Sequence, residues 1–433
     1  MQQRKGLGEE LPPLSAHEAL VEANRCLFCY DAPCTHACPT HIDIPRFIKK
    51  IATANLRGSA RTILEANLLG ATCARVCPVQ ELCEGACVLG HEHKPIMIGR
   101  LQRHAMDSTR GIDLVQRAPS TTHQIAVVGS GPAGLSCAGE LARRGHQVTV
   151  FEKRPLAGGL STYGIISLRE PIEASLEEVQ MLERLGVRIE TGAELGRNVT
   201  LDDLRQRFDA VFLGLGLGAT PALGIPGEEW ILDGLDYIEQ SKLSPAGMSI
   251  GHNVVVIGAG NTAIDCATIA KRLGAARVTM VYRRTEAEIT AYPHELAFVR
   301  REGVDLRFLT QPAGVVTENG AVTVLVCVPM KLGAPDASGR PAPVASGGQE
   351  FAIPADQVVK AIGQEKPSLA RTLGLKLDHG FVSVSAELET SIAGVFAGGD
   401  CVRAKNAAST VMAVQDGKQA AAAIHHRLKE NNG

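Results

Sequence analysis

The sequence is poor in aromatic residues and carries no strong charge imbalance. Only 4% of its 433 residues are aromatic, with a single tryptophan, whereas 45 are glycine. This composition favours nucleotide-binding α/β domains, which need glycine turns, over all-β domains, whose strands are enriched in aromatic residues. The formal net charge is −2, so charge gives no reason to expect a nucleic acid or an anionic membrane as a partner.

Long apolar runs are also missing. A membrane-spanning helix needs about 20 apolar residues, and the first segment, MQQRKGLGEELPPLSAHEAL, has no apolar core of signal-peptide length. We therefore expect a soluble, cytoplasmic protein, and its length indicates two to four domains. In a reducing cytosol, clustered cysteines indicate metal or redox chemistry more than disulfides.

The twelve cysteines are unevenly distributed, with eight of them between Cys26 and Cys87. The first group reads C-x2-C-x4-C-x3-C-P, and the second reads C-x3-C-x5-C-x3-C with a proline after its second cysteine. Structural zinc usually takes paired C-x2-C knuckles. Bacterial ferredoxins use C-x2-C-x2-C-x3-C-P, in which the fourth cysteine serves the other cluster. The pattern favours iron–sulfur over zinc or disulfides, but spacing alone does not divide eight cysteines between two sites.

The remaining four cysteines are scattered and form no CxxC pair, so the sequence shows no dithiol redox centre beside a flavin. We expect them to be small buried hydrophobic residues. They are Cys137, Cys266, Cys327 and Cys401.

The chain up to residue 118 is expected to form a helical domain. Ile44, Phe47, Ile48 and Ile51 share one face at helical spacing. Prolines divide the region into short helices, and 109–123 is a polar linker.

From residue 124 the pattern changes to strand, glycine turn, helix and strand. The unit QIAVVGSGPAGLSCAGELARRGHQVTVFEK recurs as NVVVIGAGNTAIDCATIAKRLGAARVTMVYRR, which predicts two Rossmann-like dinucleotide-binding domains. Strand and glycine-turn patterns return near residue 362. We therefore expect an α/β fold in which an NAD(P)-binding domain (249–361) is inserted in an FAD-binding domain (119–248 and 362–433).

The first glycine fingerprint follows an apolar strand and opens a helix, which is the context that supports it. Its glycines, Gly129, Gly131 and Gly134, allow the backbone to approach a pyrophosphate at the helix N-terminus. Glu152 closes the next strand, where an acid can accept hydrogen bonds from a ribose hydroxyl.

The second fingerprint contains Gly258, Gly260, Asn261 and Thr262. Its second strand ends in arginine instead of an acid. Because a planar guanidinium matches phosphate oxygens, Arg283 and Arg284 favour NADPH over NADH. A solvated basic corner is the alternative interpretation, since glutamates follow closely.

The segment VFAGGDC places Gly399 and Asp400 after an apolar strand. It resembles the second flavin motif of two-dinucleotide flavoproteins, in which the acid meets the ribityl chain. The resemblance implies that a helix starting near Ser409 directs its positive end at the isoalloxazine ring.

Seven segments, in this order, cover nearly the whole chain: CLFCYDAPCTHACPTHIDI, NLLGATCARVCPVQELCEGAC, IGRLQR, GSGPAGLSCAGEL, FEKRPLAGGLST, GAGNTAIDCAT and VFAGGD…TVMAVQDGKQA. Together they resemble the flavin- and NAD(P)-binding half of dihydropyrimidine dehydrogenase, which in bacteria is a separate small subunit. The glutamate synthase small subunit is a more distant relative whose cysteine stretch reads differently.

This resemblance implies two [4Fe–4S] clusters and assigns their ligands. One cluster is held by Cys26, Cys29, Cys34 and Cys87, and the other by Cys38, Cys77, Cys83 and the side-chain oxygen of Gln102. Cys73 is then not a ligand. From the residues alone, Cys73 would be a ligand and Gln102 a surface residue of a helix.

The resemblance also implies the nucleotide contacts. Those of the flavin are Gly131, Glu152, Leu160, Arg169, Asp400 and Thr410, and those of NADPH are Asn261, Thr262, Arg283 and Arg284. Asn261 stands where the family commonly has an acid. Bacterial small subunits can use NADH, so NADH stays possible.

The implied function is electron input. NAD(P)H passes hydride to FAD, and single electrons travel through two clusters to a partner subunit that carries FMN, further clusters and the pyrimidine site. This chemistry needs no catalytic acid or base from the protein. The chain has no room for an FMN barrel of ~250 residues, so we expect it not to reduce uracil or thymine alone.

Two alternatives stay open. The chain could be the small subunit of glutamate synthase or of another NAD(P)H-dependent oxidoreductase. It could also be a nucleotide-sensing or assembly protein with structural clusters, in which case a flavin spectrum would be absent.

Overall fold

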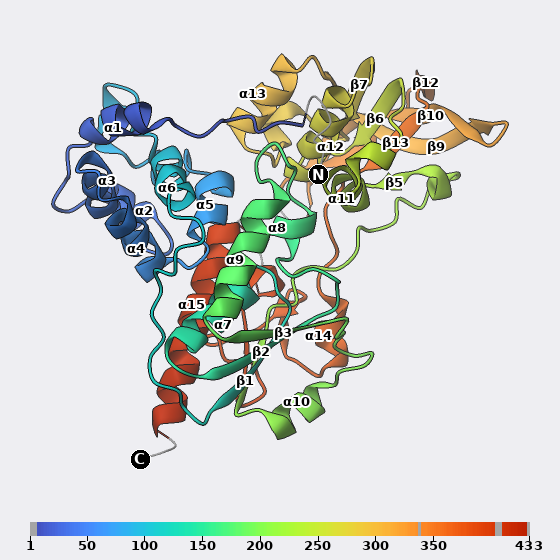
Figure 1. The fold of residues 1–433 in the computed structure, drawn as a ribbon. Coiled ribbons are helices and arrows are strands. Elements are labelled where there is room, and N and C mark those ends of the chain that lie inside the picture. Colours follow the sequence, from blue (N-terminus) through green and yellow to red (C-terminus); the bar gives the residue numbers. More distant parts are fainter. Residues whose placement is uncertain (1–6, 337–338, 403–408, 431–433) are drawn as a thin grey trace. The chain divides into compact units, whose positions relative to one another are not determined.

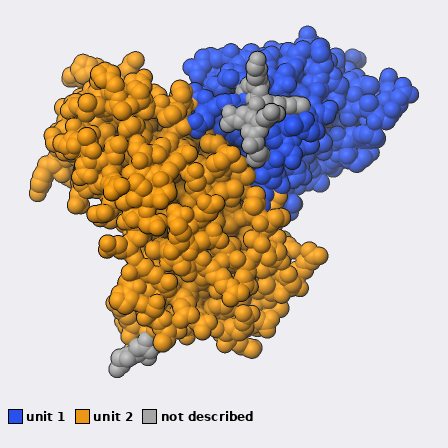
Figure 2. Space-filling model, in the orientation of Figure 1, with its two compact units in different colours: residues 1–10, 163–168, 219–365 blue, residues 11–162, 169–218, 366–433 orange. Residues whose placement is uncertain are grey.

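The computed structural model describes residues 7–336, 339–402 and 409–430 (Figure 1). As far as residue 123, the regular elements of the described chain are all helices, and both strands and helices follow. The chain divides into two compact units (Figure 2). The inserted unit comprises residues 1–10, 163–168 and 219–365. The main unit comprises residues 11–162, 169–218 and 366–433.

Short helices separated by turns form the first part of the main unit. Helix α3 buries Ile44, Phe47, Ile48 and Ile51, which confirms the predicted helical face. The helices are α1 (Ala16–Asn24), α2 (Pro33–Ala37), α3 (Ile44–Ala52), α4 (Leu56–Ala66), α5 (Gly70–Val76), η1 (Val88–His91) and α6 (Ile98–Asp107).

A five-stranded parallel sheet follows in the order β16-β4-β1-β2-β3. The C-terminal strand β16 pairs with β4, so the flavin-type domain is completed by the end of the chain. Its elements are β1 (Gln124–Val128), α7 (Pro132–Arg143), β2 (Gln147–Glu152), α8 (Leu160–Tyr163), α9 (Ile172–Arg184), β3 (Val187–Thr191), α10 (Leu201–Arg207), β4 (Ala210–Leu213), α14 (Ser368–Thr372), β14 (Leu377–Asp378), β15 (Phe381–Val382), β16 (Val395–Ala397), η5 (Gly399–Cys401) and α15 (Thr410–Glu430).

The two faces of this sheet bury alternate residues, as strand geometry requires. Ile125 and Val127 pack with residues of α7 and α15. Ala126 and Val128 pack with residues of α10 and α14 on the other face. The first of these cores also includes Leu68, which attaches the helical part to the flavin-type domain.

The inserted unit holds a second parallel sheet, in the order β5-β13-β6-β7-β8, and an antiparallel sheet of β9 to β12. Val254 and Val256 pack with residues of α11 and α12, whereas Val255 and Ile257 pack with the antiparallel strands. Its elements are η2 (Glu228–Trp230), β5 (Leu232–Asp233), α11 (Gly234–Leu243), η3 (Pro245–Gly247), β6 (Asn253–Ile257), α12 (Asn261–Arg272), β7 (Arg277–Val281), η4 (Glu286–Glu288), α13 (Pro293–Arg301), β8 (Asp305–Arg307), β9 (Thr310–Glu318), β10 (Ala321–Pro335), β11 (Pro341–Ala345), β12 (Phe351–Pro354) and β13 (Gln357–Lys360).

The predicted α/β architecture is therefore confirmed, with a helical N-terminal part and an inserted second dinucleotide fold. Residues 219–248 cluster with the inserted unit instead of the flavin-type domain, because β5 pairs with β13 and α11 packs against α12. Among the helices of the described ranges, none has both the length and the apolar character to cross a membrane.

Candidate functional site

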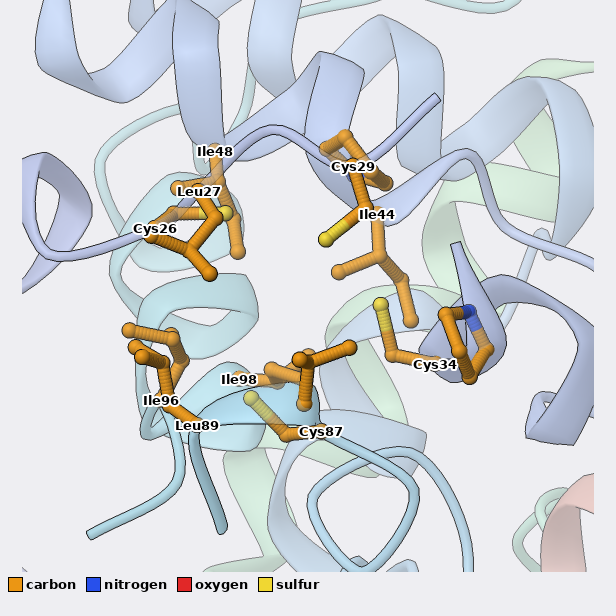
Figure 3. Close-up of a pocket in the computed structure, with 13 residues that line it drawn as sticks. Cys26, Leu27, Cys29, Cys34, Ile44, Ile48, Cys87, Leu89, Ile96 and Ile98 are labelled. Atoms are coloured by element: carbon orange, nitrogen blue, oxygen red, sulfur yellow. The ribbon is translucent and has the colours of Figure 1, made fainter. Parts of the chain in front are cut away.

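Four of the clustered cysteines surround one cavity in the helical part of the main unit. Cys26, Cys29, Cys34 and Cys87 line this cavity, and Figure 3 shows their sulfur atoms pointing into it. The sulfurs come from the loop after α1, from α2 and from the residue before η1. Folding thus gathers the four cysteines that the family resemblance groups together.

The rest of this first cavity is lined by apolar side chains and proline rings. Burial, together with the neighbouring thiols of Cys87 and Cys26, raises the pKa of Cys34 to about 11. Burial also raises the pKa of Cys26. Thiolates in such a place need nearby positive charge, and iron supplies it, because metal binding keeps its sulfur ligands deprotonated.

A second cavity is lined by Cys38, Cys77, Cys83 and Gln102. These are the residues that the resemblance assigns to the other cluster. Ile44 lines both cavities, so the two sites are neighbours. The long sequence separation between the cysteine groups is therefore closed by packing of α2 and α6 against α3 and of α5 against α6.

Gln102 lies inside the helical core, not on its surface as the residues alone would indicate. Its side chain is 7% exposed, on the same face of α6 as Ile98 and Met106. Its Nε2 donates to the carbonyl of Gly70 at 2.8 Å, which leaves Oε1 available as an oxygen ligand.

Cys73 also lines the second cavity and is buried. A side-chain hydrogen bond with Cys73 is the main cause that raises the pKa of Cys77 well above its usual range, and burial acts in the same direction. The geometry therefore brings both candidates for the fourth ligand, Cys73 and Gln102, to the same cavity.

The arrangement fits clusters better than the zinc and disulfide alternatives. None of the twelve cysteines forms a disulfide. Within the described ranges, no group of three or more cysteine, histidine, aspartate or glutamate side chains is placed to hold a single metal ion. The thiols instead surround cavities, as a multi-iron cluster with cysteine ligands requires.

The second cavity also has lining residues that no sequence motif indicates. Asn67, which follows α4, and Val411, the second residue of α15, both line it. An asparagine after a helix has the same pattern as an ordinary end cap, so the sequence carries no signal for it. Val411 brings the second cavity next to the start of the helix that is expected to face the flavin.

The first glycine fingerprint has the three distinct surroundings that a dinucleotide loop requires. Gly129 has φ of 90°, and a Cβ there would lie 2.4 Å from the carbonyl oxygen of Gly214. A Cβ on Gly134 would lie 1.9 Å from the carbonyl oxygen of Gly129. Around Gly131, at the start of α7, a Cβ would meet nothing within 4 Å. That open space adjoins the helix N-terminus, where a pyrophosphate can bind.

Glu152, at the end of β2, is 6% exposed. Its carboxylate accepts hydrogen bonds from the backbone N–H of Ser130 at 3.0 Å and of Arg154 at 2.7 Å. It therefore holds the glycine loop together. Oε2 also accepts a hydrogen bond from the Ser130 hydroxyl, so Oε1 is the oxygen that keeps a lone pair for a ribose hydroxyl.

The C-terminal motif reaches the same helix start. Gly399 has φ of 80°, and a Cβ there would lie 3.0 Å from the side chain of Ala133 in α7. Its N–H donates to Asp416 of α15 at 2.8 Å. Asp400 follows it in η5, and Thr410 is the first residue of α15. The starts of α7 and α15 and the η5 turn thus converge, as a flavin site of this type needs.

The remaining two expected flavin contacts are less defined. Leu160 begins α8 and is 43% exposed, and Arg169 lies half-buried in a turn. Both belong to the main unit.

The second fingerprint repeats the turn in the inserted unit. Gly258 has φ of 131°, and Gly260 caps α12. Asn261 and Thr262 form the first turn of that helix. The Asn261 Oδ1 accepts a hydrogen bond from the backbone N–H of Tyr292 at 3.3 Å.

The structure gives the two arginines after β7 different surroundings. Arg283 is exposed. Arg284 is 4% exposed and donates to the carboxylate of Asp336 at 2.6 Å and to the carbonyl of Pro341 at 2.9 Å. Arg284 therefore holds the ends of β10 and β11 together, and Arg283 keeps its guanidinium at the surface.

The neighbouring glutamates are engaged elsewhere. Glu286 pairs with Arg300 at 2.6 Å, and Glu288 forms a capping box with Thr285. Neither glutamate therefore pairs with Arg283, and the exposed guanidinium is compatible both with a phosphate contact and with the alternative of a solvated basic corner.

Two family models match the chain. Residues 3–113 match the model described as dihydropyrimidine dehydrogenase domain II, 4Fe-4S cluster. Residues 123–419 match the model described as pyridine nucleotide-disulphide oxidoreductase.

Curated relatives match nearly the whole chain. The glutamate synthase [NADPH] small chain of Halomonas elongata is 36% identical over 97% of this chain and 93% of its own length. The NAD-dependent dihydropyrimidine dehydrogenase subunit PreT of Escherichia coli K12 is 33% identical over 99% of both chains. The putative oxidoreductase AegA of the same strain is 34% identical over 97% of this chain, which spans 67% of that protein.

Solved structures share the fold. FprA of Mycobacterium tuberculosis, in complex with NADPH, has a TM-score of 0.58 and 20% identity, over 73% of this chain and 86% of its own. At this identity the likeness concerns the fold alone.

Proposed function

Since the chain belongs to the pyridine nucleotide-disulphide oxidoreductase family, with an N-terminal 4Fe–4S domain of the dihydropyrimidine dehydrogenase type, we propose that it is an electron-input subunit. Its partner would be an FMN- and iron–sulfur-containing subunit that reduces uracil or thymine, or runs the reverse reaction. The reductant would be NADPH, with NADH possible. FAD and two [4Fe–4S] clusters would be its resident cofactors.

When bound, these groups supply hydride acceptance and single-electron transfer, and the protein supplies binding and orientation. Gly129, Gly131 and Gly134 open the flavin loop, and Glu152 fixes it. In the inserted unit, Gly258 and Gly260 do the same for NAD(P)H. The cofactor-binding set proposed from the sequence is retained, except that Arg284 is buried against Asp336 and leaves Arg283 as the contact of the 2′-phosphate. The proposed cluster ligands are Cys26, Cys29, Cys34, Cys87, Cys38, Cys77, Cys83 and Gln102.

One observation carries the proposal: the two thiol-lined cavities adjoin each other, and the second reaches the start of α15, the helix that is expected to face the flavin (the flavin helix). Val411 of α15 lines the second cavity, and Ile44 lines both. A route from flavin to the second site and then to the first is the order that this placement supports.

The first cavity lies under an exposed apolar surface. Leu27 is 59% exposed, Val88 is 41% exposed, and Tyr30 is fully exposed. Leu27 and Val88 are also lining residues of that cavity. Exposed apolar groups beside a redox site are suited to a protein partner, so the electron exit is proposed here.

The decisive experiment uses the purified, cluster-loaded full chain. We expect it to oxidise NAD(P)H with an artificial dye acceptor and to bleach its flavin under anaerobic conditions. It should not reduce uracil until the FMN-containing partner is added. Uracil reduction by the chain alone would contradict the proposal, and so would the absence of a flavin spectrum.

Coenzyme choice is tested at Arg283. We expect Arg283→Ala to raise KM for NADPH about tenfold, as loss of a charged hydrogen bond does, and to leave KM for NADH unchanged. Arg277→Ala is the matched control, because Arg277 is an exposed arginine at the opposite end of β7. A wild-type preference for NADH would overturn the NADPH assignment.

The second candidate is a small subunit of glutamate synthase or another NAD(P)H-dependent complex. The 36% identity to a glutamate synthase small chain over 97% of this chain favours it. Mixing the chain with a glutamate synthase large chain and assaying NADPH-dependent glutamate formation separates it from the first candidate. The partner that restores transfer identifies the complex.

A further inference from the structure

We propose that the side-chain amide of Asn67 donates an N–H···S hydrogen bond to the iron–sulfur cluster of the second cavity and raises its reduction potential. The inference rests on the proposed function only in taking that cavity as a cluster site. It concerns a residue that binds no iron.

The orientation of the amide is determined by its neighbour. Asn67 follows α4 and is 1% exposed. Its Oδ1 accepts a hydrogen bond from the backbone N–H of Leu69 at 2.9 Å. A flipped amide would place its NH₂ group against that N–H, so only the orientation with Oδ1 toward Leu69 is favourable.

This orientation leaves Nδ2 as a buried donor. Among the described residues, Nδ2 of Asn67 has no hydrogen-bond partner, and Asn67 lines the second cavity. A buried donor without an acceptor is unfavourable. Because an amide NH₂ donates and does not ligate metal, the contents of the cavity have to supply the acceptor. Cluster sulfides and cysteine thiolates are acceptors of this kind.

The first cavity offers a contrast. Apart from its four cysteines, the described residues that line it are leucine, isoleucine, valine and proline. Hydrogen bonds to the sulfurs are one of the factors that set cluster potentials. A donor stabilises the reduced, more negative state, so the second cluster should be shifted to higher potential by a side chain that the first lacks.

The test replaces Asn67 with threonine in the full-length, cluster-loaded chain. Threonine keeps an oxygen for the Leu69 N–H and removes the NH₂ group. In an anaerobic redox titration followed by EPR, Asn67→Thr should lower the midpoint of the second cluster. A tenfold change in the electron-transfer equilibrium constant equals 59 mV, and we expect a shift of up to that size, with the first cluster unchanged.

The matched control is Asn55→Thr. Asn55 caps the other end of the same helix through the N–H of Gly58 at 2.9 Å and is exposed. The Asn55→Thr variant should leave the midpoint potentials of both clusters at their wild-type values. A shift of the same size in both variants would contradict the proposal.

A measurement on the wild-type chain removes the dependence on cluster assembly in the variant. Asparagine labelled with ¹⁵N at its side-chain amide should give a hyperfine coupling to the reduced second cluster, because Asn67 is the only asparagine among the described residues that lines either cavity. Absence of that coupling, or an unchanged midpoint in Asn67→Thr, overturns the inference while the electron-input function stands. If the purified chain contains enough iron for only one cluster, both the inference about Asn67 and the proposed electron-input function are overturned.

Discussion

At Gly131 the backbone conformation does not require glycine, so a substitution there can change flavin binding without changing the stability of the fold. Its φ is −68°, and a Cβ would meet nothing within 4 Å. We expect Gly131→Ala to fold normally and to lose at least about tenfold in FAD affinity, because the methyl group occupies space meant for the pyrophosphate. Flavin absorbance after gel filtration measures the content, and thermal unfolding measures the fold.

Gly134 provides the comparison. There a Cβ would lie 1.9 Å from the carbonyl oxygen of Gly129, so Gly134→Ala should lower the melting temperature of the main unit as well as the flavin content. Equal melting temperatures in the two variants, or normal flavin binding by Gly131→Ala, would contradict this account of the loop.

Single residues were predictable where their chemistry is local. The scattered cysteines Cys137, Cys266, Cys327 and Cys401 are all 0% exposed, as expected of small apolar side chains. Long-range partners were not predictable. Nothing near Arg284 in the sequence indicates its partner Asp336, which directly follows the distant strand β10. Gln102 has a polar side chain, so a helical pattern alone predicts it at the surface.

At the scale of elements, a buried carboxylate joins the flavin-type domain to the cysteine helices. Glu178 of α9 accepts hydrogen bonds from the backbone N–H groups of Ala71 and Thr72, at the start of α5. Burial raises the pKa of Glu178 to about 8, with a contribution from the charge of Glu170, although the hydrogen bonds act in the opposite direction.

This pKa predicts a pH dependence with a definite sign. Because the folded pKa exceeds the unfolded value, the stabilisation is fully present below about pH 4.5 and is lost as pH rises toward 8. At about 1.4 kcal/mol per pKa unit the loss is at most about 5 kcal/mol. Glu178→Gln should remove this dependence, so that its urea midpoint falls less than that of the wild type between pH 5 and pH 9.

Glu177→Gln is the matched control for Glu178→Gln. The adjacent Glu177 side chain is 44% exposed and pairs with Arg110 at 3.3 Å, so its replacement should keep the wild-type pH profile. If the Glu178 and Glu177 variants behave alike, the buried carboxylate does not control the joint between α9 and α5.

Elements with strong periodicity were predictable, and short ones were not. The face of α3 and the two strand–turn–helix units follow from side-chain spacing alone. The strand β5 has only two residues, Leu232 and Asp233, so the sequence gives no sign that residues 219–248 join the inserted unit. The antiparallel strands β9 to β12 were also not anticipated, because they cover the second sheet through a core that joins residues far apart in the sequence, such as Ile257 and Leu325.

At the scale of the whole molecule, the two cysteine-lined cavities and the flavin helix α15 belong to one unit. Lys418 of α15 donates to the carbonyls of Thr40 and Ala66 at 3.0 and 2.9 Å. Thr40 follows Cys38, and Ala66 precedes Asn67, so this lysine fixes the flavin helix to both sides of the second cavity. The order of sites is therefore a property of packing, which the cysteine spacing could not provide.

This order of sites predicts that loss of the first cluster affects dye reduction and electron transfer to the partner differently. Cys87→Ser removes a proposed ligand of the first cavity and leaves the second cavity and the flavin loop unchanged. We expect reduction of a small dye by NAD(P)H to stay within about twofold of the wild-type rate, because the dye takes electrons from the flavin. Transfer to the FMN-containing partner should fall at least about tenfold, since the proposed exit is lost.

Cys73→Ser is the matched control, because Cys73 lines the second cavity without being a proposed ligand. It should keep the iron content and both activities of the wild type. Iron analysis and EPR of the two variants, beside the dye and partner assays, test the whole assignment. Unimpaired transfer to the partner in Cys87→Ser would place the exit elsewhere, and loss of iron in Cys73→Ser would make Cys73 a ligand in place of Gln102.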